Sequence, residues 1–425
     1  MSEPSFHTRR KFLRTAILGG SIAWTLPAFV DRTFAALNNA AIGSAVQTAT
    51  GKDSTILVIL QLSGGNDGLN TVIPYSDDAY HRARPHIGIK PASVLRLDGH
   101  LGLNPRMPQL ARLFHEGHAS VMQGVGYPNP NRSHFRSMEI WQTASDSDKT
   151  EPHGWLGRYF DNCCRGEDPA TGISLGDQMP QAFSAATPMG IALKNPRQFR
   201  FADEADVRDD ASMQSGNEGG SIGALAGDTH SDLDAFHYIE RVALDAQVSS
   251  DRIGKIAARH RDTPDYPHSQ LGQDLKLIAQ LIAGGMPTRV YYAGMGGFDT
   301  HANQVGQQDQ LLGQLDDALA AFVADLRAQR NFDRVAMMTF SEFGRRVAEN
   351  GSGGTDHGTA APMFLLGGGI RPGLAGITPS LTDLTAGDLK YTVDFRSVYA
   401  TLLEKWLHAP SAEVLGRQFP LLGFV

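Results

Sequence analysis

Aspartate and histidine occur together in two short polar segments in the second half of the chain. Asp299 and His301 stand two residues apart after an apolar run, and Asp356 and His357 are adjacent behind a glycine-rich loop. Carboxylate oxygens and imidazole nitrogens are ligands that divalent metal ions favour. Taken alone, the first pair is explained equally well by a capped turn with a histidine beside it. Both pairs are therefore candidate metal ligands that need support from elsewhere in the chain.

Two further carboxylates follow apolar runs. Asp67 lies in a glycine-rich turn, and Glu342 comes shortly after a run that ends at Phe340. A charge at the end of a buried strand costs free energy unless it is paired or binds a cation. The alternatives are an ordinary turn for Asp67 and neutralisation by Arg345 for Glu342.

These carboxylates and imidazoles indicate metal binding more strongly as a set than singly. Four carboxylates packed together without cations would repel one another, and two divalent ions would relieve that repulsion. Two ions about 3.5–4 Å apart can clamp a phosphoryl-type group for in-line displacement. The predicted ligands of two divalent metal ions (Mn, Mg, Ca or Zn) are Asp67, Asp299, His301, Glu342, Asp356 and His357.

A candidate nucleophile follows an extended, proline-rich loop. Arg132, Ser133 and His134 are consecutive, and a helix is expected to begin at Ser133. A helix start offers free backbone N–H groups and the positive end of the helix dipole. A serine there suits attack on an anionic ester, and Arg132 and His134 could orient the anion. The alternative is that Ser133 is an ordinary helix-capping residue.

Secondary structure must position these residues, and apolar runs predict five strands. Helical spacing of apolar residues precedes the third and the fourth strand. Strands that alternate with helices predict one α/β domain with a central, mostly parallel sheet between layers of helices. In such sheets, sites form beyond the carboxyl ends of the strands, where the polar segments lie. The predicted strands are 55–62, 119–122, 288–292, 334–340 and 363–366, and the predicted helices are 275–282 and 311–326.

The N-terminal segment has the layout of an export signal. Arg9 and Arg10 precede a Phe-Leu step, and a short apolar stretch follows over residues 15–30. A membrane span needs about 20 apolar residues, more than this stretch offers. Paired arginines before a short apolar core are read by the twin-arginine translocation machinery. We predict that residues 1–36 are a twin-arginine signal peptide, and that the protein is exported folded, is periplasmic or secreted, and has no permanent membrane anchor.

The rest of the chain is interpreted as a linker (37–52) and one domain (53–425). Within the domain, residues 199–231 are acidic and rich in Gly and Ser, which predicts a flexible insertion. Cys163 and Cys164 are the only cysteines. Neighbouring Cα atoms lie about 3.8 Å apart, closer than usual disulfide geometry, so two unpaired thiols are expected in preference to a strained disulfide. The net charge of -7 argues against a nucleic-acid partner.

Six separated motifs resemble, in order, those of a bacterial family called domain of unknown function 1501. The resemblance covers residues 55–407. That family is similar to the alkaline-phosphatase and sulfatase superfamily, whose α/β members act on phosphate, phosphonate or sulfate esters with a metal pair. The resemblance therefore implies an alkaline-phosphatase-like three-layer sandwich. The motifs are QLSGGNDGLN (61–70), RSHF (132–135), GWLGR (154–158), GFDTH (297–301), SEFGR (341–345) and GTDHG (354–358).

The resemblance also implies residue roles, and the chain departs from the superfamily pattern in two places. Asp299 and His301 are two apart where the superfamily usually has four, and Glu342 is followed by Phe343 in place of a histidine. A site richer in oxygen ligands would favour Mn, Mg or Ca over a zinc pair. The implied nucleophile, or its positional counterpart, is Ser133, and the implied metal ligands are Asp67, Asp299, His301, Glu342 and His357, with Asp356 beside the last.

Two functions follow from these observations. The first is an exported, metal-dependent hydrolase of phosphate or sulfate esters, which acts on a small anionic ester with a serine nucleophile and a metal pair. The second is a non-catalytic periplasmic binding or assembly protein on the same fold, which the Glu342-Phe343 departure favours.

Overall fold

The computed structural model describes residues 55–193 and 264–425, apart from residues 166, 177 and 188, and also residues 253, 255 and 256. All of these residues belong to one compact unit, Thr55–Val425. Three predicted segments lie outside the described residues: the signal peptide (1–36), the linker (37–52) and the acidic insertion (199–231).

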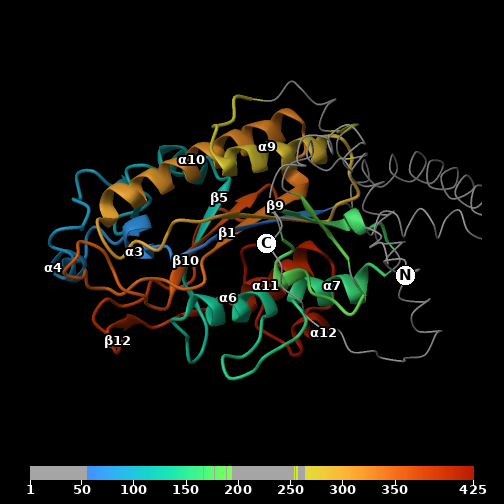
Figure 1. Ribbon diagram of the computed structural model, residues 1–425. Coiled ribbons are helices and arrows are strands. Elements are labelled where there is room, and N and C mark those ends of the chain that lie inside the picture. The colour runs from blue at the N-terminus through green and yellow to red at the C-terminus, as the bar shows by residue number, and fades with distance from the viewer. Residues whose placement is uncertain are drawn as a thin grey trace, which may run out of the picture. The chain divides into compact units, whose positions relative to one another are not determined.

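A nine-stranded sheet lies at the centre of the described residues (Figure 1). Its strands run in the order β11-β5-β10-β9-β1-β8-β6-β7, and β14 also pairs with β5. β10 is antiparallel to both of its neighbours, whereas the other pairs are parallel. The strands are β1 (Ile56–Leu62), β5 (Ala119–Gly126), β6 (Gly172–Leu175), β7 (Ile191–Leu193), β8 (Val290–Met295), β9 (Val335–Phe340), β10 (Ala361–Gly367), β11 (Gly373–Ala375) and β14 (Val393–Asp394).

Strand β5 is longer than its apolar run predicts. The run ends before Gly124, but the strand continues to Gly126. Gly124 has a φ of 64°, which a residue with a Cβ atom rarely adopts, and the pairing with β10 shifts register between Ala361 and Met363. The glycine therefore continues the strand through a bulge instead of ending it.

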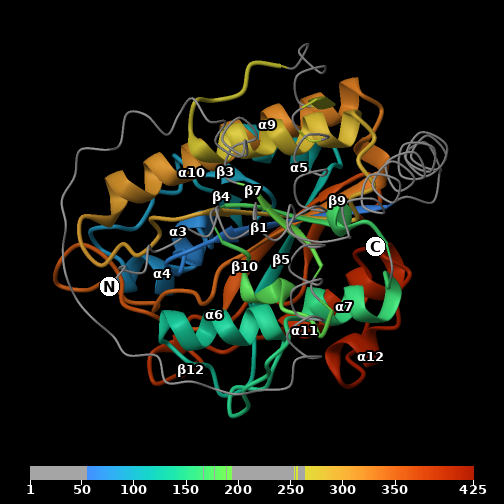
Figure 2. The ribbon, with the colours of Figure 1, turned by 45° about the vertical axis from the view of Figure 1, so that its right-hand side comes forward.

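Alternate residues of β1 pack against opposite faces of the sheet. Ile56, Val58 and Leu60 belong to one buried cluster, whereas Leu57 and Ile59 belong to another. Helices α5, α9 and α10 bury their apolar residues in the first cluster, and α6, α7, α11 and α12 bury theirs in the second. Figures 1 and 2 show the two helical layers on either side of the sheet. The bounds of these helices are α5 (Pro108–His115), α6 (His134–Thr143), α7 (Trp155–Cys163), α9 (Gln270–Ala283), α10 (Gln304–Ala328), α11 (Phe395–Thr401) and α12 (Ser411–Leu415).

This arrangement confirms the predicted α/β fold, a mostly parallel sheet between two helical layers. Both cysteines are free thiols, with Cys163 exposed and Cys164 buried, as expected. None of the helices in the described part of the chain combines the length and the apolar character that crossing a bilayer requires. The smaller elements are α3 (Gly68–Thr71), β2 (Val72–Ile73), α4 (Asp78–Ala83), β3 (Leu95–Arg96), β4 (Gly102–Leu103), β12 (Leu384–Thr385), β13 (Asp388–Leu389), three 3-10 turns (Pro169–Thr171, Gln181–Phe183 and Phe332–Arg334) and a π-helical turn (Leu402–Trp406).

Candidate metal centre

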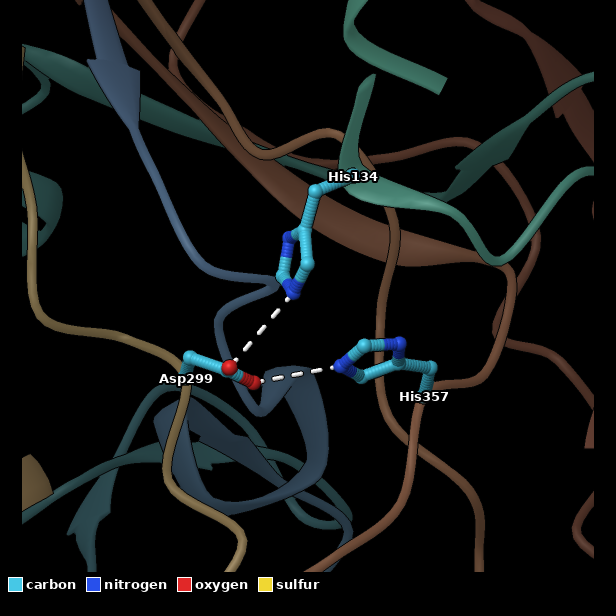
Figure 3. A group of neighbouring side chains, drawn as sticks. All are labelled: His134, Asp299 and His357. Carbon is cyan, nitrogen blue, oxygen red and sulfur yellow. Dashed lines mark hydrogen bonds and ion pairs between the residues drawn. The ribbon is translucent and has the colours of Figure 1, made fainter. Parts of the chain in front are cut away.

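One edge of the sheet brings together side chains from four distant segments, and Figure 3 shows three of them, His134, Asp299 and His357. Asp299 follows β8 and Glu342 follows β9, so both lie beyond carboxyl ends of parallel strands. His134 is the first residue of α6, which follows β5. His357 precedes β10, and because β10 is antiparallel, its start lies at the same edge. The predicted position of the site, beyond the carboxyl ends of the strands, is therefore where the chain places these residues.

The Asp299 carboxylate is the point on which three imidazoles converge. The Nε2 atoms of His301 and His357 each lie 3.1 Å from its Oδ1 atom, and they lie 2.9 Å from each other. The Nε2 atom of His134 lies 3.5 Å from its Oδ2 atom. Ligands bound at about 2.1 Å to one tetrahedral ion stand roughly 3.4 Å apart, so these separations suit a single metal ion. Ligand atoms of His134, Asp299 and His357 lie within 4.8 Å of one another, a group that could hold such an ion.

Hydrogen bonds on the far side of two rings fix the direction in which their Nε2 atoms point. His357 Nδ1 lies 2.9 Å from the backbone oxygen of Arg132, which can only accept, so Nδ1 carries the hydrogen. His134 Nδ1 lies 2.8 Å from Oε1 of Glu342. Figure 3 shows both rings turned with Nε2 toward Asp299. Histidines that bind metals are commonly held in this way through their other nitrogen.

Glu342 reaches the group only through His134. Its Oε1 atom also accepts a hydrogen bond of 2.8 Å from the backbone N–H of Gly64, and its side chain is 2 % exposed. The sequence predicted Glu342 as a metal ligand; in the structure its carboxylate contacts Nδ1 of His134, a member of the candidate metal group. His134 was predicted to orient an anion, but its Nε2 atom is part of the candidate metal site.

Arg345 ties the loops of the site together, a role that the sequence did not predict. Its side chain is fully buried, and Nη2 lies 2.7 Å from Oδ1 of Asp299. Its Nη1 atom also lies 3.4 Å from Nε2 of His301, and the guanidinium donates to backbone carbonyls of three separate segments. The accepting carbonyls belong to Gly64, Gly65, Phe298 and Thr355.

Arg345 forms an ion pair with Asp299, and this pair keeps the Asp299 carboxylate ionised. Neutralisation of Glu342 by Arg345 was the alternative to metal binding, but Arg345 pairs with Asp299. Partial burial raises the pKa of Asp299, but hydrogen bonds from Arg345 and His357 outweigh it and hold the pKa at about 2. The carboxylate is therefore ionised at neutral pH.

The structure does not bring Asp67 into this group. Its buried carboxylate forms an ion pair of 2.5 Å with Nη1 of Arg84, accepts a hydrogen bond from Gln304, and caps α3 through the N–H of Leu69. Both carboxylate oxygens of Asp67 therefore have partners within the protein: Oδ2 contacts Arg84 and Gln304, and Oδ1 accepts from the N–H of Leu69. A guanidinium occupies the place that the sequence assigned to a metal ion.

Asp356 lies at the rim of the centre, on the outer side of His301. One of its carboxylate oxygens is 3.7 Å from Nδ1 of His301 and 3.1 Å from the amide nitrogen of Asn350. The hydrogen bond from Asn350, with the positive charge of Arg346 adding to it, lowers the pKa of Asp356. Its contact with the group therefore runs through His301.

Ser133 is exposed at the start of α6, whereas Arg132 is held by contacts with other residues. Ser133 is the exposed N-cap residue of α6. Its side chain makes no capping hydrogen bond, so its hydroxyl is not engaged in capping the helix. The Arg132 guanidinium is bound to Asp388 and its carbonyl to His357. The loop that precedes α6 is thus anchored at the centre by both the backbone and the side chain of one residue.

Two residues of α6 were missed although the sequence carried a signal for them. Ser137 Oγ and Trp141 Nε1 both donate to the backbone oxygen of Glu342, the latter at 2.8 Å. They stand four apart, on the face of α6 that also carries Ser133. Helical spacing from Ser133 could therefore have identified the face that holds α6 against the loop after β9.

Solved structures that resemble the chain share about one residue in ten with it. A protein in the alkaline phosphatase superfamily from Vibrio parahaemolyticus has 11% identity and a TM-score of 0.39, with 87% of this chain and 70% of that chain covered. The zinc complex of the C-terminal periplasmic domain of EcEptC from Escherichia coli has 12% identity and a TM-score of 0.34, with 75% and 73% covered. The PsFucS1 sulfatase from Pseudoalteromonas sp. has 11% identity and a TM-score of 0.35, with 88% and 72% covered.

Comparison at the level of sequence gives a family. No curated protein matches the chain. The model of a family described as "Protein of unknown function (DUF1501)" matches residues 54–423, a range that includes all of the strand-end motifs. The chain therefore belongs to this family.

Proposed function

We propose that the protein is a metal-dependent hydrolase of phosphate or sulfate esters that binds one divalent ion through His134, Asp299 and His357, with His301 beside them. The observation that carries this proposal is the convergence of three Nε2 atoms on one carboxylate. The imidazoles of His301 and His357 face each other at 2.9 Å here, an arrangement that a nearby cation stabilises. Deletion of any of these side chains should therefore weaken metal binding.

One ion explains the charges of the described residues better than the two predicted from the sequence. The second ion was invoked to relieve repulsion among four carboxylates. Arg84 pairs with Asp67, and Arg345 pairs with Asp299, so two guanidinium groups relieve much of that repulsion. The remaining ligand set is rich in nitrogen, which favours zinc or another transition metal over Mg or Ca.

Ser133 is the proposed nucleophile. Its exposed hydroxyl stands at the N-terminus of a ten-residue helix, where free N–H groups and the helix dipole favour a negative charge. The bound ion would polarise the anionic ester. Ser133 would attack in line, the alcohol would leave with a proton, and water would then release the anion from the serine. We place this reaction in the periplasm or outside the cell, after export by the twin-arginine machinery, on the strength of Arg9 and Arg10.

Elemental analysis of the mature protein, purified without chelators, tests the metal proposal. We expect about one equivalent of a divalent metal, and loss of that metal in an Asp299→Ala/His357→Ala double variant. His86→Ala is a matched control because His86 also contacts a carboxylate, that of Glu349, but on the surface. Absence of metal, even after soaking in Zn, Mn, Mg and Ca, would overturn the proposal.

Ser133→Ala tests the chemistry separately. The variant should keep its metal and its fold but lose turnover of a panel of aryl phosphate and aryl sulfate esters. Turnover that survives in this variant would remove Ser133 from the nucleophile role.

A second function, a metal-binding protein without catalysis, is favoured by one observation. Phe135, next to His134, is 91 % exposed, and a ring so open to water at the rim of a site suits contact with a partner. This function predicts metal binding without turnover of any ester, whereas the first predicts both.

A further inference from the structure

Two arginines beside the metal centre share one buried carboxylate. The guanidinium of Arg132 donates to Oδ2 of Asp388, and Nε of Arg346 lies 3.7 Å from Oδ1 of the same residue. The Asp388 side chain is only 2 % exposed, whereas Arg132 and Arg346 are 38% and 37% exposed. Two positive charges thus face one negative charge, and both guanidinium groups reach solvent.

The guanidinium of Arg346 has hydrogen-bond donors to spare. Its Nε atom is buried without an acceptor, because 3.7 Å is too long for a hydrogen bond to Asp388. The backbone on which it stands is fixed, since Arg84 donates to the carbonyls of Arg346 and Val347. A planar, partly exposed cation on ordered backbone is well suited to bind an oxyanion.

Backbone contacts link both arginines directly to the metal centre. The carbonyl of Arg132 accepts the hydrogen bond from His357, and Ser133 follows it in the chain. Arg346 follows Arg345, and its N–H donates to the carbonyl of Asp356 at 3.0 Å. The cationic pair therefore lies on the rim of the site, beside the proposed nucleophile.

We propose that Arg346, together with Arg132, binds a second anionic group of the substrate. The substrate class is then a phosphate or sulfate ester that carries a further phosphate, sulfate or carboxylate, with one anion at the metal ion and the other at the arginines. This inference rests on the proposed function, since it needs the first anion to bind at the metal centre. It concerns binding alone and adds no chemical step.

Calorimetric binding of phosphonates to the metal-loaded protein tests the second subsite. The probes are α,ω-alkanediphosphonates with one to four methylene groups, each compared with the alkylphosphonate of the same length. We expect at least one diphosphonate to bind about tenfold more tightly than its partner, beyond the factor of two that two equivalent ends supply. Arg346→Ala should abolish this advantage and leave metal content and alkylphosphonate affinity unchanged.

Two further variants make the test specific. Arg346→Lys should restore part of the advantage, because it keeps the charge but not the planar fork. Arg82→Ala should have no effect, because Arg82 is an exposed arginine on α4 that does not contact Asp388. A diphosphonate advantage that persists in Arg346→Ala, or that is absent from the unaltered protein while alkylphosphonates still bind, overturns the second subsite alone. A protein that binds neither metal nor alkylphosphonates overturns the proposed function and this inference together.

Discussion

The Nε2 atoms of His301 and His357 lie 2.9 Å apart, each 3.1 Å from the same oxygen of Asp299. His357 Nδ1 donates to the carbonyl of Arg132, and this contact directs its Nε2 atom at Asp299 and His301. Two ring nitrogens and a carboxylate oxygen this close together need a proton or a metal ion between them. Variants of the surrounding residues separate the proposed metal ligands from the residues that orient them.

Glu342→Gln should weaken metal binding without removal of a ligand. The carboxylate orients His134 through Nδ1, and loss of such a partner typically lowers metal affinity by about 10–100-fold. Competition with a chromogenic chelator measures this affinity. Glu349→Gln is the matched control, because Glu349 contacts His86 at the surface and should have no effect. Equal affinities in Glu342→Gln and the unaltered protein would remove Glu342 from this role.

Arg345→Met should strongly lower the free energy of unfolding. The substitution leaves Asp299 without its cation and leaves carbonyls of three segments without their donors. Removal of one partner of a buried ion pair costs about 3–5 kcal/mol, and the half-exposure of Asp299 places this pair at or below the lower end. Urea unfolding of metal-free protein measures the loss. The exposed Arg371→Ala should change stability by less than about 0.5 kcal/mol.

Much of the fold could be predicted because the signals were local. β1 and β9 were predicted almost to the residue from unbroken apolar runs. Helical spacing predicted the middle of α9 and of α10, and both helices begin earlier than predicted. The antiparallel direction of β10 relative to its neighbours could not be predicted, because an apolar run does not indicate in which direction the strand runs through the sheet. That direction matters for the site, since it places His357 beside Asp299.

The partners of the charged residues could not be predicted from the sequence, for a different reason. Glu342 and His134 are 208 positions apart in the sequence, and Asp299 and Arg345 are 46 positions apart. Tertiary packing alone therefore determines which of these residues form pairs. The residue types of the centre could be predicted as a set. Their division into ligands, orienting groups and ion pairs required the geometry.

Asp274→Asn should stabilise the protein at neutral and alkaline pH. Burial raises the pKa of Asp274 to about 6, and its one hydrogen-bond donor, Gln270, remains available to asparagine. The folded state binds the proton more tightly than the unfolded state, whose pKa is about 3.9, so stability falls as pH rises from about 4 through 6. The variant should therefore exceed the unaltered protein by on the order of 2 kcal/mol at pH 8, and the difference should vanish near pH 4.

Urea unfolding across this pH range measures the effect. Asp265→Asn, at an exposed position, is the control and should follow the unaltered protein. A difference between Asp274→Asn and the unaltered protein that stays constant with pH would show that titration of Asp274 is not its cause.

Ser137 and Trp141 should act on stability as a coupled pair, because both donate to the backbone oxygen of Glu342. Either donor alone satisfies that carbonyl, so Ser137→Ala or Trp141→Phe should each cost about 1 kcal/mol. Loss of both buries an unsatisfied acceptor, and the double variant should cost about 1 kcal/mol more than the two single changes together. Tyr127→Phe supplies the correction for the second contact that Ser137 makes, with the Tyr127 hydroxyl. A strictly additive cycle would mean that the two donors do not share one acceptor in solution, and that α6 is held against the centre by packing alone.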